Sequence, residues 1–158
     1  MKLFTSYFYM IRFFAPNFIP LSTAVWDPKW YHNFLDQKNL FVDKNGVING
    51  VRAPFLAPGD SCSHLCRGPE NCATKDPNTC PFLREYEKQL NMLDDAGFKG
   101  WLDTMAERVK VLLSYKGDPV FCLIVHEAPT NPCSERVILQ KRFGCTELTK
   151  HDIEMYRG

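Results

Sequence analysis

Four cysteines lie close together in one short polar stretch of the chain. The stretch reads SCSHLCRGPENCATKDPNTCPF and contains Cys62, Cys66, Cys72 and Cys80. Thiolates at such spacings can converge on one tetrahedral zinc or on one iron–sulfur cluster, because the Gly, Pro, Asn and Asp residues between them let the backbone turn around a centre. We therefore predict that these four cysteines bind a metal.

The spacings do not decide which metal is bound. Cys62 and Cys66 are four residues apart, as zinc favours, but the gaps to Cys72 and Cys80 are wider than in a standard zinc finger. Cys80 is followed by proline, as is the last cysteine of some 4Fe-4S ligand runs. His64 lies between the first two cysteines and is an alternative ligand. We favour zinc and keep a 4Fe-4S cluster as the alternative.

Disulfides and unpaired thiols are the competing interpretations of the cysteines. The chain has seven cysteines, so a secreted form would leave at least one unpaired. The apolar run from Leu3 to Ile11 is broken by Arg12, Pro16 and Asn17, which is a poor secretion signal. Because this signal is poor, we expect a cytoplasmic location. Clustered cysteines in a cytosolic protein more often bind metal or take part in catalysis than form disulfides.

A second group of reactive residues follows the most apolar run of the chain, Val120–Val125. This run predicts a buried strand, and His126 and Glu127 come directly after it. In an open α/β sheet, ligands bind beyond the carboxyl ends of the strands. Glu127 could therefore move protons, or it could simply cap a turn.

The helix predicted next supplies further candidates. Asn131 can cap it, with the helix continuing over 134–143, so that Cys133 would lie near its positive end. A thiol there, near Arg136, has its thiolate stabilised and could be a nucleophile, with Glu135 as another proton carrier. The alternatives are that Cys133 only packs beneath the helix and that Arg136 is an ordinary surface cation.

The composition limits the class of protein to which the chain can belong. The 158 residues are 45% hydrophobic, which suits one domain over 1–158 with a single core. The net charge of +1 gives no overall electrostatic signal for nucleic acid or anionic lipid. The apolar runs are also shorter than a membrane span requires, so no membrane association is expected.

Hydrophobic periodicity predicts the elements that must position these groups. Strands alternate with helices, which indicates an α/β fold: a single three-layer Rossmann-like domain with a mostly parallel sheet and a cysteine-rich metal-binding insertion over 60–81. The DKNGVING sequence predicts a small hairpin or loop. The remaining predicted strands are 2–8, 18–25 and 145–148, and the remaining helices run from Pro81 to a stop at Gly97 and over 98–115.

Several short motifs resemble one known family. TSYF at 5–8, PKWY at 28–31, LAPG at 56–59 and the stretch VFCLIVHEAPTNPCSERV occur in the order seen in the bacterial and phage family called domain of unknown function 488. The likeness covers most of the chain. It implies a Rossmann-like domain with a cleft for a nucleotide, nucleobase or nucleic acid.

The resemblance also implies site residues. Glu127 would be the glutamate of an E-x-P motif and Cys133 the cysteine of a C-H-R motif. The chain departs from the second motif, because Ser134 and Glu135 stand where the family has His and Arg, and Arg136 comes one place later. The residues placed at or near the strand ends would be Thr5, Ser6, Tyr7, Lys29 and Trp30.

Two functions follow as expectations. The first is an enzyme acting on a nucleotide, nucleobase or nucleic acid at a glycosidic or related bond. Glu127 would be the acid/base or substrate-orienting group and Trp30 a stacking surface, while Lys29 and Arg136 would hold a phosphate. The second is a non-catalytic, metal-stabilised binding module for a protein or nucleic acid, which the departure at Ser134 and Glu135 favours.

Overall fold

The molecule is built around a small parallel sheet. The structure is a computed structural model, and it describes residues 2–31, 41–63, 65–66 and 76–158. Within these residues the strand order is β2-β3-β1-β4. The four strands are β1 (Lys2–Tyr7), β2 (Phe18–Ser22), β3 (Val120–Val125) and β4 (Thr146–Glu147), and all neighbouring pairs are parallel. The predicted parallel α/β fold is confirmed.

Strand β3 is the central strand that its apolar sequence predicted. It pairs with β1 from Val120 to Val125 and with β2 from Val120 to Ile124, and all six of its residues are buried. β2 can contain Pro20 because it lies at the edge of this sheet, where a missing backbone donor is tolerated. β3 therefore ends between the two strands that flank it.

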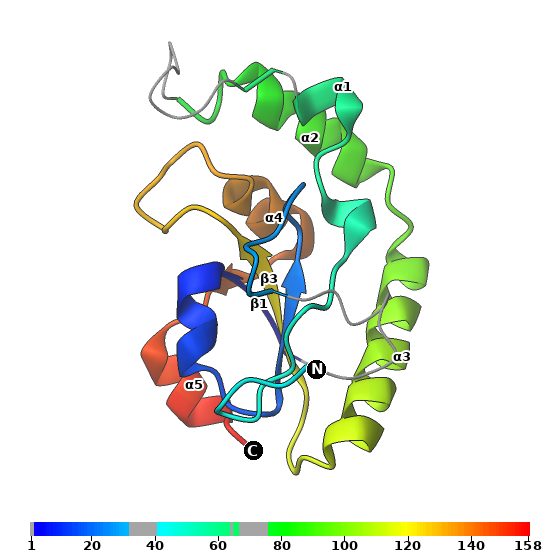
Figure 1. Ribbon diagram of the computed structural model, residues 1–158. Helices are drawn as coiled ribbons and strands as arrows, with labels where there is room; N and C mark the ends of the chain where they lie inside the picture. Colours follow the sequence, from blue (N-terminus) through cyan, green and yellow to red (C-terminus); the bar gives the residue numbers. More distant parts are fainter. Residues whose placement is uncertain (1, 32–40, 64, 67–75) are drawn as a thin grey trace.

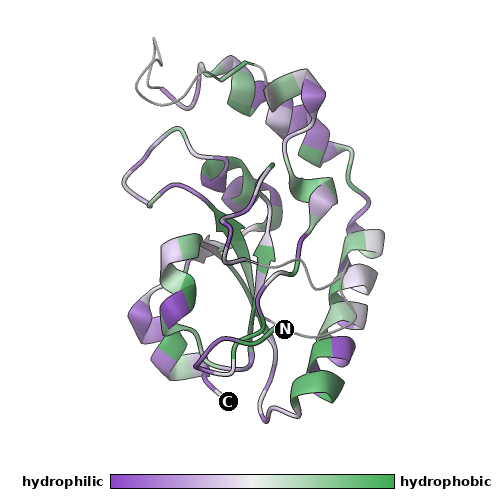
Figure 2. Ribbon diagram, in the orientation of Figure 1, coloured by the Kyte–Doolittle hydropathy of each residue, from purple (hydrophilic) through white to green (hydrophobic). Residues whose placement is uncertain are grey.

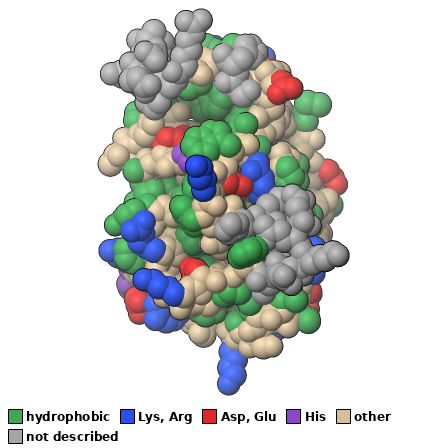
Figure 3. Space-filling model, viewed as in Figure 1, with side chains coloured by type: hydrophobic (Ala, Val, Ile, Leu, Met, Phe, Trp, Pro, Cys, Tyr) green, Lys and Arg blue, Asp and Glu red, His purple; other side chains and the backbone are tan. Residues whose placement is uncertain are grey.

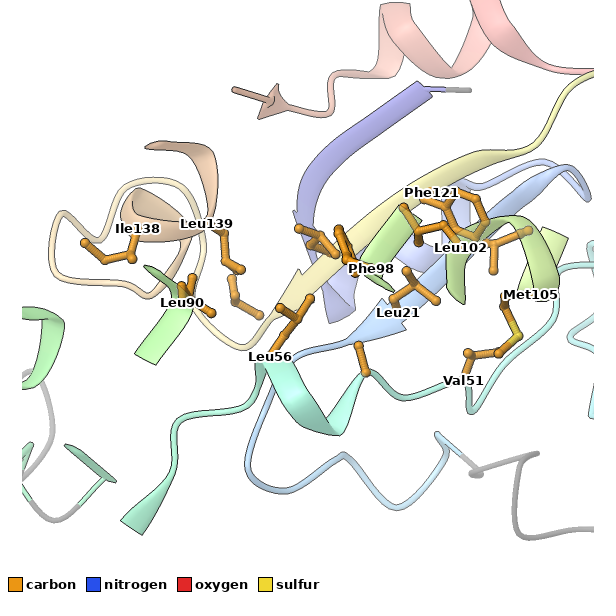
Figure 4. Close-up of a cluster of buried hydrophobic side chains, with 14 of the residues drawn as sticks. Leu21, Val51, Leu56, Leu90, Phe98, Leu102, Met105, Phe121, Ile138 and Leu139 are labelled. Carbon is orange, nitrogen blue, oxygen red and sulfur yellow. The ribbon is translucent and has the colours of Figure 1, made fainter. Parts of the chain in front are cut away.

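Side chains on the two faces of the sheet enter two separate cores, and helices cover both faces of the sheet (Figures 1 and 2). Phe121, Leu123 and Val125 of β3 face one core, and their neighbours Val120, Cys122 and Ile124 face the other, as the two-residue period of a strand requires. The first core is closed by α2 (Pro81–Asn91), α3 (Asp95–Leu113) and α4 (Arg136–Phe143), as seen in Figure 4. The second is closed by η1 (Phe8–Phe13) and α5 (Lys150–Tyr156). The result is a three-layer, Rossmann-like arrangement.

Two helix boundaries differ from the sequence prediction. Gly97 does not end a helix but lies in the first turn of α3, where its N–H donates to the carboxylate of the N-cap residue Asp94 at 2.9 Å. A helix starts here instead of ending, because the Asp94 carboxylate accepts a hydrogen bond from a backbone N–H that would otherwise be free at the helix start. Likewise α4 begins at Arg136, so Asn131 is not its cap and Cys133 precedes the helix.

Among the described residues between β2 and α2, the stretch around Arg52 lies along the edge of the sheet. Val42 and Ile48 form an antiparallel bridge around the predicted DKNGVING turn, and Ser22 is bridged to Arg52 beside β2. The short helices η3 (Pro54–Leu56) and α1 (Asp60–Ser63) then lead to α2. No helix in the described ranges is long and apolar enough to cross a membrane.

Candidate active site at the carboxyl ends of the strands

Two glutamates meet beyond the end of β3. Glu127 lies two residues after the strand, and Glu135 lies immediately before α4. Their side chains are joined by a hydrogen bond. Burial, the negative charge of Glu127 and this hydrogen bond together raise the pKa of Glu135 from 4.5 to about 8, and burial is the largest of the three causes. At neutral pH, Glu135 therefore holds a proton and donates it to the Glu127 carboxylate.

The carboxyl pair lines a small pocket. The pocket has a volume of ≈ 100 Å³, and its walls are 23–26 after β2, 125–127 at the end of β3, and Glu135. The two walls are tied together because the Thr23 hydroxyl donates to the Ile124 carbonyl at 2.9 Å. Figure 3 shows acidic, basic and histidine side chains gathered among hydrophobic ones on the viewed face. The pocket lies where parallel-sheet proteins bind ligands, as the sequence predicted.

Trp26 forms the exposed wall of the pocket. Its side chain is 66% exposed, and its ring lies 4.2 Å from the ring of His126. His126 Nε2 is 2.7 Å from the Trp26 carbonyl, which requires a proton on that nitrogen. On its other side, His126 packs against Phe8 at 4.8 Å. His126 is thus half-buried and packs between Trp26 and Phe8.

Arg136 is an anchor of the site. It is 5% exposed, and its Nε donates to Glu147 Oε1 at 2.5 Å. Its Nη1 donates to the Ala128 carbonyl at 3.1 Å and its Nη2 to the Glu127 carbonyl at 2.7 Å. The expectation that Arg136 holds a substrate phosphate is not supported, because the guanidinium is buried and binds the loop that carries Glu127. Arg136 instead positions that loop.

The three residues predicted on β1 do not line the pocket. Thr5 donates to Glu147 Oε1 at 2.9 Å and accepts from Gln140 Nε2 at 2.8 Å, so it belongs to the network that holds Arg136. The Tyr7 ring lies beside the Arg136 guanidinium, 5.7 Å from its centroid. The Ser6 hydroxyl is buried and has no hydrogen-bond partner among the described residues. β1 therefore contributes side chains that contact Arg136 and its partners, and none of the three lines the pocket.

Lys29 and Trp30 lie on the surface beyond the pocket. Trp30 is 47% exposed and packs edge-on against Phe8 and Tyr31, with centroids 6.0 Å apart in both cases. Lys29 is exposed. Trp26, which sequence analysis had not singled out, occupies the pocket wall instead. Its position directly after the β2 segment was the available signal.

Cys133 also lies outside the pocket lining. Its backbone N–H donates to Asn131 Oδ1 at 3.0 Å in a turn three residues before α4. The expected placement in the first turn of that helix is therefore wrong. Of the predicted catalytic residues, the structure brings Glu127 into the pocket, adds Glu135 as its partner, and puts Arg136 behind them.

The cysteine stretch is described only in part. Cys72 lies outside the described residues, as does His64, while Cys66 is exposed. Cys62 and Cys80 are buried in the core that contains α2. The Cys62 thiol donates to the Gly59 carbonyl at 3.3 Å, and burial raises its pKa. In the part of the chain that is described, no three His, Cys, Asp or Glu side chains are grouped to hold a metal. The metal centre stays a prediction.

Comparisons with known proteins do not assign the chain to a family. No protein-family model, curated protein or solved structure matches it.

Proposed function

We propose that the protein is an enzyme that cleaves the bond between a nucleobase and its sugar, using Glu135 and Glu127 as a pair. The observation that carries the proposal is the pairing of Glu135 with Glu127 inside a pocket with a tryptophan wall, where burial and the neighbouring charge raise the pKa of Glu135 to about 8. A carboxyl group that keeps its proton at neutral pH can act as a general acid. The resemblance to domain of unknown function 488 points to the same class of substrate.

Trp26 determines the kind of molecule that suits the pocket. An indole ring offers a flat stacking surface, and the His126 ring packs against it with centroids 4.2 Å apart. A planar nucleobase in the pocket would stack on this ring with its edge toward the two carboxyl groups. The base would then accept a hydrogen bond from Glu135 through a ring nitrogen or a carbonyl oxygen.

The proposed reaction balances without a cofactor. Glu135 protonates the base as the bond from the sugar carbon to the base nitrogen breaks, and the bonding electrons leave with the base. The negative charge of Glu127 stabilises the positive charge that develops on the sugar. Water then adds to the sugar carbon and gives its proton to Glu127, from which Glu135 is reprotonated. The pair thus returns to its starting state.

The hydrogen bond between the two carboxyl groups limits the kinds of glycosidic mechanism in which they can take part. Glycosidases that use separate carboxyls on opposite faces of a sugar keep them about 5 Å or more apart. Glu127 and Glu135 are closer than that because they share a hydrogen bond. They suit a mechanism in which both groups act on one side of the substrate and a single proton is exchanged between them.

The test is release of a free base from a panel of nucleosides and oligonucleotides, followed by chromatography. Glu135→Gln should reduce the rate at least 100-fold, because the amide cannot donate an acidic proton. Glu154→Gln is the matched control, since that carboxylate is 70% exposed and distant in sequence from the pocket. Full activity of Glu135→Gln toward a substrate that the wild type cleaves would refute the proposal.

A further inference from the structure

The pocket is too small for a whole nucleotide. Its ≈ 100 Å³ compares with about 300 to 1,000 Å³ for sites that enclose a small ligand. One ring system fills such a space, so the sugar, the phosphates and any neighbouring nucleotides must lie outside. The surface around the mouth therefore decides which substrates are held.

A continuous row of aromatic rings leads from the pocket to Trp30. The Trp26 ring contacts His126, His126 lies 4.8 Å from Phe8, and Phe8 lies 6.0 Å from Trp30. Trp26 and Trp30 are at the two ends of the row, and both rings are exposed. Two accessible indoles linked by packed rings form a preformed surface on which two bases can stack.

Both tryptophans are held in place before any substrate arrives. The Trp26 carbonyl is bound by His126, and the Asp27 carboxylate pairs with Arg52 at 2.6 Å, which fixes the segment that follows β2. Trp30 is wedged against Phe8 and Tyr31. Stacking on rings that are already ordered loses little conformational entropy, so each stacked base contributes more to affinity.

Lys29 adds one positive charge beside this row. It is exposed, and within the described residues it takes part in no ion pair. Arg52 is neutralised by Asp27. In the part of the chain that the structure describes, the surface therefore offers two stacking rings and, at Lys29, one cation for a phosphate, a pattern that suits a flexible strand and not a rigid, highly charged duplex.

We propose that the substrate is a base within single-stranded nucleic acid rather than a free nucleoside. This inference rests on the proposed function. The target base enters the pocket against Trp26, the adjacent base stacks on Trp30, and the intervening backbone passes Lys29. A free nucleoside makes only the first of these contacts and is bound more weakly.

Binding measurements test this without requiring turnover. The probes are a 10-nucleotide single-stranded DNA, the RNA of the same sequence, the matching duplex and the free nucleosides. At least one single strand should bind tenfold or more tightly than any nucleoside and than the duplex. Trp30→Leu should weaken single-strand binding about tenfold and leave nucleoside binding unchanged. Trp101→Leu is the matched control, because Trp101 lies on α3 and packs against Phe55 of η3, outside this row of rings.

Salt dependence gives a second readout. Because Lys29 supplies one phosphate contact, Lys29→Gln should reduce the slope of log affinity against log salt by about 1. The inference is overturned if nucleosides bind as tightly as both single strands, if the duplex binds best, or if Trp30→Leu changes nothing. Base release from nucleosides that depends on Glu135, without preference for a strand, would refute only this inference and leave the proposed function standing.

Discussion

Glu135 should make the protein less stable as the pH rises toward neutrality. Its pKa is about 8 in the folded protein and 4.5 as an ordinary glutamate, so folding favours the protonated form. Below about pH 4.5 both states hold the proton, and the favourable term is fully present. Above that pH the unfolded chain ionises freely while the folded protein resists, and the term is lost progressively until the pH passes the folded pKa.

The size of this effect follows from the pKa difference. Each pH unit between the unfolded and folded pKa costs up to about 1.4 kcal/mol of stability. From pH 5 to pH 7, this gives a loss of roughly 2 to 3 kcal/mol in the free energy of unfolding from the raised pKa of Glu135. Replacing Glu135 by glutamine removes the titration but keeps a side chain of the same size. The variant should therefore gain stability relative to the wild type as the pH rises.

Urea denaturation at several pH values between 5 and 7 measures the difference directly. The comparison is the difference in unfolding free energy between wild type and Glu135→Gln, in which the contributions of titrating groups away from the carboxyl pair cancel. Glu127→Gln should reduce the pH dependence without abolishing it, since burial is the larger cause of the raised pKa of Glu135. Glu154→Gln, at an exposed site, should have a profile parallel to that of the wild type.

The reasoning fails if Glu135→Gln and the wild type lose stability in parallel over this range. Such a result would mean that Glu135 ionises normally in the folded protein. It would then be a carboxylate at neutral pH, and the general-acid role proposed for it would lose its basis.

Two further predictions concern other parts of the molecule. Glu147→Gln removes the negative charge that pairs with Arg136. The variant should lower the free energy of unfolding by about 2 kcal/mol, because a buried guanidinium loses its counter-charge. Urea denaturation with Glu154→Gln as control measures this difference, and an unchanged stability would contradict the prediction. Anaerobically purified protein should contain one metal centre, colourless if the metal is zinc and brown if it is a 4Fe-4S cluster. Cys72→Ser should lose the metal, whereas Cys145→Ser should keep it. Purified protein without metal would show that the cysteine stretch does not bind one.

The central strand and its position were predictable because they depend on local pattern. Val120–Val125 is apolar at every position, and its short length and its β-branched and aromatic residues favour a strand buried on both faces. Helix ends were less predictable. Glycine often ends a helix, which is why Gly97 was predicted as a stop. The Asp94 carboxylate can instead cap the start of a new helix, and which of the two occurs depends on the path of the chain.

Of the candidate site, the sequence identified Glu127 and the edge of the sheet on which it lies. It also noted Glu135 as a carrier of protons. It misjudged Arg136, because a cation in a polar stretch resembles a ligand-binding group until its partners are known. Those partners are Glu147, eleven residues away, and two loop carbonyls, and no local pattern marks such contacts.

The sequence by itself determined the alternation of strands and helices, the burial of β3 and the acidic residue placed at its end, since each follows from hydrophobic period and chain direction. Only the tertiary structure decided that Glu135 returns to meet Glu127, that Trp26 rather than Trp30 walls the pocket, and that Arg136 faces inward. The physical reason is that burial and pairing depend on residues brought together by separate elements. The same glutamate would be an ordinary carboxylate in solvent, and the fold makes it an acid that keeps its proton at neutral pH.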